Sequence, residues 1–423
     1  MLQHRPNSSP RTTAGGRIVR AILASALISF LILSTAQGQT FTVIHHFTGG
    51  SDGANPIAGV TVDAAGNLYG TASAGGRRGY GDVYRLVHSG PGWLFSLVYT
   101  FLGDAVGDGI SPQSRVVIGP GGFLYGTTRS GGGGDGCRER HGCGTVFRVK
   151  PKPGASLDPW QETVLYSFGT YDGSDPYYGD VVFDAVGNLY GTTRDGGAYL
   201  QGVVYELTPQ AGMWKEQVLY SFAGTPDGSA PMGGVAMNQA GVLFGTTSAG
   251  GMAGWGAVYQ LRLSASGWTE SVLYSFEGAG DGETPIAGVV VGPSGVLYGA
   301  TLAGGINGGG TVLALTPGGG SSWDFSTLYG FGGSGGPYGG LIADQAGNLY
   351  GTTSGDGAGR QGSVFKLTLS SGQWMYTSLH DFTGGLDGGT PYGGLALDAN
   401  GNLYGTASVG GAYGNGVVFQ VRQ

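Results

Sequence analysis

The chain has 423 residues, of which 91 are glycine and 18 are proline, and its formal net charge is −7. Roughly a quarter of the residues are thus Gly or Pro, which without a repeat pattern is typical of low-complexity chains. Disorder is excluded because 40% of the residues are apolar and only 11% are charged. Collagen is excluded because glycine does not recur at every third position, so we expect the glycines at fixed places in a folded repeat.

Residues 1–38 have the pattern of a secretory signal peptide. Arginines precede an apolar run from Ala21 to Leu33, and small residues then offer cleavage sites after Ala36 or Gly38. The run is too short for the ~20 residues of a membrane-spanning helix, so we expect no membrane insertion after cleavage. Cleavage would remove four Arg and no acidic residue, which changes the net charge from −7 to −11. No basic cluster remains, and this excludes nucleic acid as a partner.

A motif of the form Gly-x-Leu-(Tyr/Phe)-Gly-(Thr/Ala)-(Thr/Ala) occurs seven times after this segment, at spacings of 52 to 65 residues. Its aromatic residues are Tyr69, Tyr125, Tyr190, Phe244, Tyr298, Tyr350 and Tyr404. Each period holds four short runs rich in β-branched or aromatic residues, separated by turn residues and without helical periodicity. Four strands in a repeat of about 50 residues predict an all-β fold, a β-propeller with four-stranded antiparallel blades. The alternative, a parallel β-helix, would need much shorter repeats.

The two ends of the propeller sequence complement each other. We name the strands of each blade a to d, from the axis outwards. Residues 41–47 form a d-type run, whereas residues 416–421 at the other end form a c-type run. The last blade therefore lacks its outer strand, and the N-terminal run is expected to supply it. Such pairing closes the ring and removes an exposed sheet edge, so residues 39–423 are predicted to form a seven-bladed propeller.

The sequence Gly-Asn-Leu-Tyr-Gly-Thr-Thr, followed by Gly-Gly and by Gly-x-Val-(Phe/Tyr)-x-Leu, resembles the GloVer tandem repeat of exported bacterial proteins. The resemblance runs from about residue 41 to 423. It implies an exported protein, secreted or periplasmic, and it brings no catalytic residue or cofactor with it. Members of this family often carry a C-terminal surface anchor, whereas this chain ends at its last strand, which favours release or residence in the periplasm. We expect a monomer.

The two cysteines, Cys137 and Cys143, bracket a short loop in the longest repeat. In an oxidising compartment outside the cytoplasm, a local disulfide between them is expected. The alternative is a metal site that adds His141 as a ligand, but this set has too few ligands at an unusual spacing. We therefore predict no metal.

In this topology the d–a links and the b–c loops lie on one face of the ring, which we name the loop face. Six links carry an Asp-Gly pair, whose aspartates are Asp52, Asp108, Asp172, Asp227, Asp281 and Asp387. Such pairs favour tight turns. A calcium ring is the alternative, but these acids belong to separate blades, whereas Ca²⁺ needs about six to eight oxygens in one place.

Aromatic residues recur on the loop face. The candidates are Tyr177, Tyr178, Tyr338 and Tyr392 near the channel mouth, and Tyr80, Tyr199, Trp255 and Tyr413 in the b–c loops. Exposed rings of this kind stack against sugars or hold protein partners. The alternative is that they pack on neighbouring loops.

The first position of strand a departs from its pattern in two consecutive blades. Glycine occupies this position in five blades and suits close backbone approach near the axis, whereas the other two carry Arg115 and Asp180. The opposite charges predict an ion pair at the channel mouth. This pair either plugs the channel or leaves Arg115 to bind an anionic group of a ligand.

Patterns for catalysis are weak. The sequence has no serine nucleophile motif and no glycine-rich loop between a strand and a helix, and its six histidines are scattered. We therefore predict a binding module for an extracellular glycan or protein, without catalysis. The alternatives are a polysaccharide lyase or hydrolase with its site at the channel mouth, and a structural scaffold of the cell envelope.

Overall fold

The computed structural model describes residues 39–134, 136–137, 141–152, 154, 159–333 and 335–423. The predicted signal peptide, residues 1–38, lies outside the described residues. Within those residues, no helix is long and apolar enough to cross a membrane. The described residues include the 3-10 turns η1 (Asp104–Val106), η2 (Pro120–Gly122) and η4 (Pro293–Gly295).

The described chain forms seven four-stranded antiparallel sheets, as the repeat predicts. Blade 1 consists of β2 (Val60–Val62), β3 (Leu68–Ala72), β4 (Asp82–Ser89) and β5 (Gly92–Thr100), and blade 2 of β7 (Val117–Ile118), β8 (Leu124–Thr128), β10 (Thr145–Pro151) and β11 (Trp160–Ser167). Blade 3 consists of β12 (Val182–Phe183), β13 (Leu189–Thr193), β14 (Val203–Gln210) and β15 (Met213–Ser221), and blade 4 of β17 (Ala236–Met237), β18 (Leu243–Thr247), β20 (Ala257–Ser264) and β21 (Gly267–Ser275). Blade 5 consists of β22 (Val290–Val291), β23 (Leu297–Thr301), β24 (Thr311–Pro317) and β25 (Trp323–Gly330), and blade 6 of β26 (Ile342–Ala343), β27 (Leu349–Thr353), β28 (Ser363–Ser370) and β29 (Gln373–Asp381). Blade 7 consists of β30 (Ala396–Leu397), β31 (Leu403–Ala407), β32 (Val417–Arg422) and β1 (Thr40–His46).

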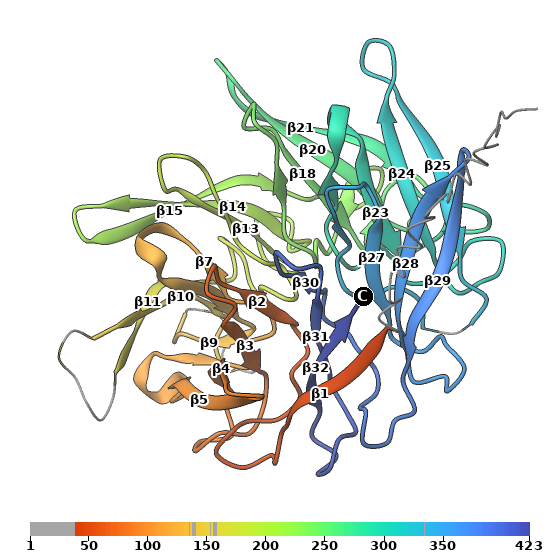
Figure 1. Cartoon of the computed structure of the whole chain (residues 1–423). Coiled ribbons are helices and arrows are strands. Elements are labelled where there is room, and N and C mark those ends of the chain that lie inside the picture. Colours follow the sequence, from red (N-terminus) through yellow and green to blue (C-terminus); the bar gives the residue numbers. More distant parts are fainter. Residues whose placement is uncertain (1–38, 135, 138–140, 153, 155–158, 334) are drawn as a thin grey trace, which may run out of the picture. The chain divides into compact units, whose positions relative to one another are not determined.

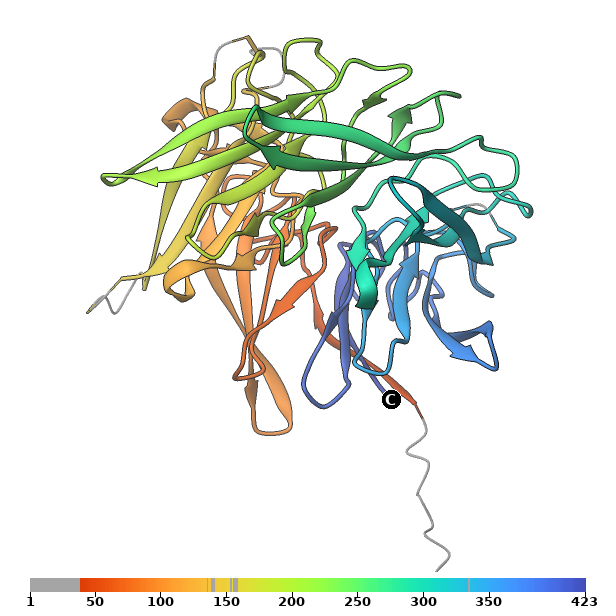
Figure 2. The same ribbon diagram turned by 90° about the horizontal axis from the view of Figure 1, so that it is seen from above.

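The first strand closes the ring, as predicted. Strand β1 pairs antiparallel with β32, with Phe41 opposite Val421 and His46 opposite Val417. The blades follow one another around an axis, so that the beginning and the end of the propeller meet in blade 7 (Figures 1 and 2). The β1–β32 pair also has a register shift near Val43, as do the other six c–d pairs. The N-terminal strand is thus an outer strand in every respect.

Apolar side chains fill the spaces between blades. Each of seven buried clusters combines residues of two consecutive blades. In six blades the glycine after the motif aromatic leaves room for a ring on the adjacent strand; a Cβ at Gly126, for example, would lie only 2.7 Å from the ring of Phe147. In blade 5 the opposite residue is Leu313 rather than an aromatic. Burial on both faces explains why these strands are apolar throughout.

The inner strands are shorter than the sequence suggests. The run Gly-Gly-Val-Ala-Met ending at Met237 contributes only its last two residues to β17. The preceding glycines instead touch the backbone of neighbouring blades, since a Cβ at Gly233 would collide with Gly288 and one at Gly234 with Asp180. At the start of strand a, close backbone contacts between neighbouring blades around the axis therefore take the place of hydrogen-bonded strand pairing within the blade.

The d–a links and the b–c loops lie side by side, which defines the loop face. Two small sheets join a link to the b–c loop of the same blade: β6 (Gly109–Ile110) with β9 (Ser130–Gly131), and β16 (Gly228–Ser229) with β19 (Ala249–Gly250). In addition, the carbonyl of each residue before the linker proline accepts a hydrogen bond from the residue after the Gly-Thr-Thr motif, as Asp175 does from Arg194. This repeated bond places two otherwise distant positions next to each other in every blade.

Candidate functional site

The linker aspartates are used within their own turns. The Asp108 carboxylate accepts a hydrogen bond from the hydroxyl of Tyr99 at 2.8 Å and one from the backbone amide of Leu102 at 2.7 Å. Tyrosine on the preceding d strand repeats this contact at three other links, and His45 and His380 replace it at the remaining two. These carboxylates therefore build turns. Over the described ranges, no three His, Cys, Asp or Glu side chains come together as a metal site.

Arg115 and Asp180 meet at the channel mouth. The guanidinium Nε and Nη2 of Arg115 lie 2.9 Å and 2.6 Å from Oδ2 of Asp180, and the Arg115 amide donates to Oδ1 at 2.9 Å. Nη1 also reaches the carbonyl of Leu395 in blade 7, at 3.4 Å. The pair therefore ties blades 2, 3 and 7 together across the axis. The ligand-binding role of Arg115 stays a prediction.

Four of the candidate tyrosines form a continuous series, which we name the tyrosine row: Tyr177, Tyr178, Tyr338 and Tyr392. Neighbouring ring centroids lie 4.2, 5.0 and 4.6 Å apart in that order, all edge to face. The first two residues precede blade 3, whereas the last two precede blades 6 and 7 on the opposite side of the ring. The row therefore crosses the channel mouth. Burial, reinforced by neighbouring tyrosines, raises the pKa of Tyr178 and Tyr338 well above the ordinary value.

The aromatic residues of the b–c loops are placed differently. Tyr80 lies against Gly103 and Trp255 against Gly278, so both rings cover a d–a link, as the packing alternative describes. Tyr199 and Tyr413 are more open, with 61% and 62% of their surface exposed. Among the described residues, none of these four rings touches the tyrosine row.

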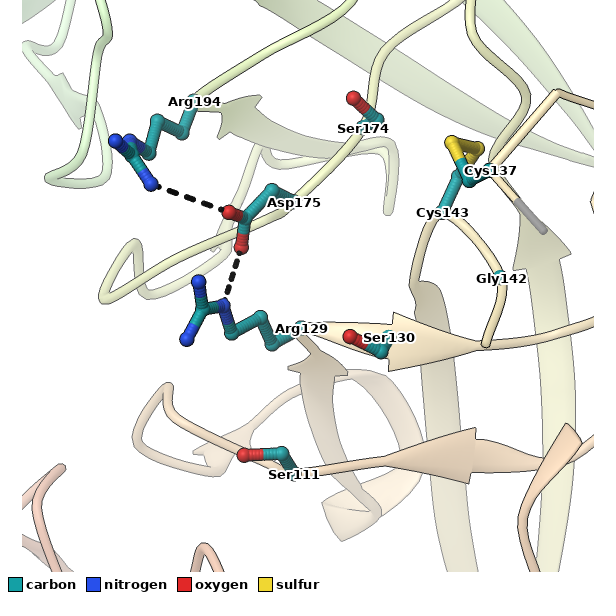
Figure 3. Close-up of a pocket in the computed structure, with 9 residues that line it drawn as sticks. All are labelled: Ser111, Arg129, Ser130, Cys137, Gly142, Cys143, Ser174, Asp175 and Arg194. Atoms are coloured by element: carbon teal, nitrogen blue, oxygen red, sulfur yellow. Dashed lines mark hydrogen bonds and ion pairs between the residues drawn. A yellow bond between two sulfur atoms is a disulfide. The ribbon is translucent and has the colours of Figure 1, made fainter. Parts of the chain in front are cut away.

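Beside the row lies a cavity of 370 Å³, which we name the arginine cavity. Its lining residues are Ser111, Arg129, Ser130, Cys137, Gly142, Cys143, Ser174, Asp175 and Arg194. Cys137 and Cys143 are joined in a disulfide, with their Cα atoms 5.1 Å apart. Both half-cystines line the cavity (Figure 3).

Two arginines share one aspartate in this cavity. Arg129 Nε lies 3.0 Å from Asp175 Oδ1, and Arg194 Nη1 lies 3.4 Å from Oδ2, so the guanidinium groups approach the carboxylate from opposite sides (Figure 3). Burial raises the pKa of the Asp175 carboxyl, although Arg129 opposes the rise. Both guanidinium groups also face the ring of Tyr177, at 5.0 and 5.7 Å from its centroid. The arginine cavity and the tyrosine row are therefore continuous at Tyr177.

Arg129, Asp175 and Arg194 were not among the residues that the sequence predicted. A signal was present, because both arginines directly follow a Gly-Thr-Thr motif. Five blades carry other residues at that position: Ser73, Ser248, Leu302, Ser354 and Ser408. Blades 2 and 3, which carry these arginines, are also the two blades in which Arg115 and Asp180 replace glycine at the start of strand a.

The carboxyl groups with strongly raised pKa lie elsewhere. Burial raises the pKa of Asp82 to about 6, of Glu162 to about 8 and of Glu216 and Glu270 to about 7. These residues belong to c and d strands, away from the axis. None of them lines the arginine cavity or the small cavity of 60 Å³ beside Arg115 and Asp180.

A family model for the Gloeobacter/Verrucomicrobia repeat matches residues 30–259 and 233–423. The chain belongs to this family, which confirms the resemblance seen in the motif. None of the curated proteins compared with the chain matches it.

Several solved structures share the fold. An ulvan lyase from a polysaccharide lyase family is 10% identical, with a TM-score of 0.52, and the match covers 88% of this chain and 96% of the lyase. That lyase is also solved bound to -[GlcA(1-4)Rha3S]-. The extracellular domain of a putative hybrid two-component system from B. thetaiotaomicron is 11% identical, with a TM-score of 0.53, over 91% of this chain and 42% of that one. A putative 6-phosphogluconolactonase from Bacteroides uniformis is 13% identical, with a TM-score of 0.51, over 81% of this chain and 88% of that one. At such identities the likeness shows the fold alone.

Proposed function

We propose that this member of the Gloeobacter/Verrucomicrobia repeat family is an extracytoplasmic binding protein whose loop face recognises a glycan. The tyrosine row carries the proposal, because it brings four half-buried rings from opposite sides of the propeller to one place on the loop face. Tyrosine combines an apolar ring with a polar hydroxyl, which suits the alternating apolar and hydroxylated surfaces of a sugar. The row lies beside a cavity lined by serine hydroxyls, which supply further hydrogen-bonding groups.

Two further observations support this proposal. The disulfide in the cavity wall fits a compartment outside the cytoplasm. The ulvan lyase that shares the fold is solved with a sugar chain, so a propeller of this kind can present a glycan surface. The strongly perturbed carboxyl groups lie away from both loop-face cavities, which favours binding over catalysis.

A glycan array probed with the purified protein tests the proposal. The matched variants are Tyr338→Ile and Tyr392→Ile, because Ile57 and Ile286 follow the linker proline in blades 1 and 5. We expect each variant to weaken glycan binding by about 1 kcal/mol or more, the typical contribution of an aromatic contact. Met213→Ser, in an exposed c–d hairpin, is the control and should bind normally.

Two results would decide against the proposal. If no glycan binds the wild-type protein, the loop face does not recognise sugars. If a polysaccharide binds and is also shortened, as measured by released reducing ends or unsaturated products, the protein is a polysaccharide-cleaving enzyme instead.

A further inference from the structure

The arginine cavity carries more cationic hydrogen-bonding capacity than its own aspartate requires. A guanidinium group has five N–H donors. In the described part of the chain, Arg129 donates one of them to protein, from Nε to Asp175, and Arg194 likewise donates one, from Nη1. The Nε of Arg194 is buried and has no hydrogen-bond partner among the described residues. A buried donor without an acceptor is unfavourable, so the described protein groups do not fully satisfy the Arg194 guanidinium.

One arginine would be enough to neutralise the Asp175 carboxylate. The described lining residues of the cavity hold two arginines and one aspartate, and the carboxylate of Asp195 lies near enough to act on Asp175. Neither arginine is required by the fold, because Ser248 occupies the equivalent position in blade 4 and donates its hydroxyl to the linker carbonyl of Ala230 at 2.9 Å. The backbone arrangement of this region therefore does not depend on either guanidinium group.

The cavity is built to hold its arginines in place. Asp175 is only 4% exposed and fixes both guanidinium groups, while Tyr177 lies against each of them. The two arginine side chains remain 38% and 37% exposed, so a ligand can reach them. The cavity volume of 370 Å³ falls within the ~300–1,000 Å³ typical of small-molecule sites. Preorganised, accessible guanidinium groups are the usual partners of carboxylate, sulfate and phosphate.

We infer that the arginine cavity binds an acidic group of the glycan, the carboxylate of a uronic acid or a sulfate ester, while neighbouring sugar rings lie on the tyrosine row. This inference rests on the proposed function, since it names the class of glycan. Continuity through Tyr177, whose ring lies 4.2 Å from that of Tyr178, places the anion site at one end of the row. Binding is non-covalent and leaves the glycan intact.

Calorimetric titration with paired probes tests the inference. The acidic probes are a hexamer of galacturonic acid and dextran sulfate, and their neutral partners are the methyl-esterified hexamer and dextran. We expect at least one acidic probe to bind at least about tenfold more tightly than its neutral partner, as loss of a charge-assisted hydrogen bond implies. Added salt should weaken this binding. The acidic probe that binds also distinguishes a carboxylate from a sulfate ligand.

The variant Arg129→Ser/Arg194→Ser/Asp175→Ala copies blade 4 at the cavity and removes its charged groups. We expect it to lose the preference for the acidic probe and to keep the wild-type unfolding temperature within a few degrees. Arg262→Ser, an exposed arginine on strand β20, is the charge-matched control and should bind like the wild type.

Three results would overturn the inference. They are equal binding of acidic and neutral probes, undiminished acidic binding by the triple variant, and failure of both acidic probes to bind. If neutral glycans on the array still bind, the proposed function survives without the inference. If nothing on the array binds, both fail.

Discussion

Asp82 is buried in blade 1 in a position that does not suit a charge. Its side chain is fully buried, and within the described structure neither carboxylate oxygen accepts a regular hydrogen bond. Asp82 lies opposite Ala72 in the ladder, whereas the equivalent pair in blade 7 is Val417 opposite Ala407. The substitution Asp82→Val therefore copies an arrangement that the same propeller already contains, and we expect it to stabilise the protein at neutral pH.

The size of the effect follows from the carboxyl pKa. Burial raises the pKa of Asp82 from 3.8 to about 6, with the hydroxyl of Thr100 opposing the rise and Asp52 adding to it. Between these values the unfolded chain has lost the proton and the folded chain still holds it, so raising the pH favours unfolding. One pKa unit corresponds to about 1.4 kcal/mol, so the wild-type free energy of unfolding should lose about 3 kcal/mol between about pH 3.5 and 6.5.

The assay compares wild type and Asp82→Val by calorimetric melting at pH 4 and pH 7. With about 2.1 cal/mol/K of unfolding entropy per residue, 3 kcal/mol corresponds to a gain of about 4 °C at pH 7 for a unit of this length. The gain should shrink towards pH 4, where the wild-type carboxyl is protonated. Asp82→Asn, neutral and similar in shape, separates the charge from the packing. An equal gain at both pH values would refute the reasoning, because the charge would then play no part.

Three other predictions concern stability. Arg115→Leu leaves Asp180 without its cation and should lower the free energy of unfolding, measured in urea titrations, by about 1–2 kcal/mol. Adding Asp180→Gly, which introduces the residue of the five other blades, should restore the lost stability. Removal of Thr40–His46 exposes the edge of β32, and we expect a lower melting temperature and concentration-dependent light scattering, whereas an unchanged melt would show that β1 does not close the ring. Glu216→Phe copies Phe95 of blade 1; because burial raises the pKa of Glu216 to about 7, it should stabilise by about 1–2 kcal/mol at pH 8 and by much less at pH 5, as melting curves at both pH values would show.

The repeat in the sequence was sufficient to predict the ring. The motif marks strand b in every blade, and the complementary ends at β1 and β32 indicate seven complete blades with a closed ring. Closure joins Thr40 to Arg422 at the two ends of the propeller and was predicted from the complementary strand types, whereas the motif and the strand order concern residues that pair within one blade. Short sequence distances of this kind leave a direct pattern in composition and spacing. The length of strand a was the exception, because the crowding of glycines at the axis depends on all seven blades.

The candidate site was predictable only in part. The exceptions at Arg115 and Asp180 were visible, because they break a glycine pattern in adjacent blades, and the structure pairs them. The arginines of the cavity break a similar pattern after the motif, but their aspartate lies in a linker, where residue type varies from blade to blade. Only the backbone bond that joins the linker to this position brings Arg194 to Asp175.

The sequence by itself determined the number of blades and the strand order, because both follow from contacts repeated at one period. It also determined the closure of the ring, because the strand types at the two ends complement each other. The tertiary structure alone decided that Tyr178 and Tyr338, which are 160 residues apart, touch across the channel mouth. That contact depends on the closed ring, which places blade 3 opposite blade 6. No local pattern records this distance, and the proposed binding surface therefore exists only once the ring has closed.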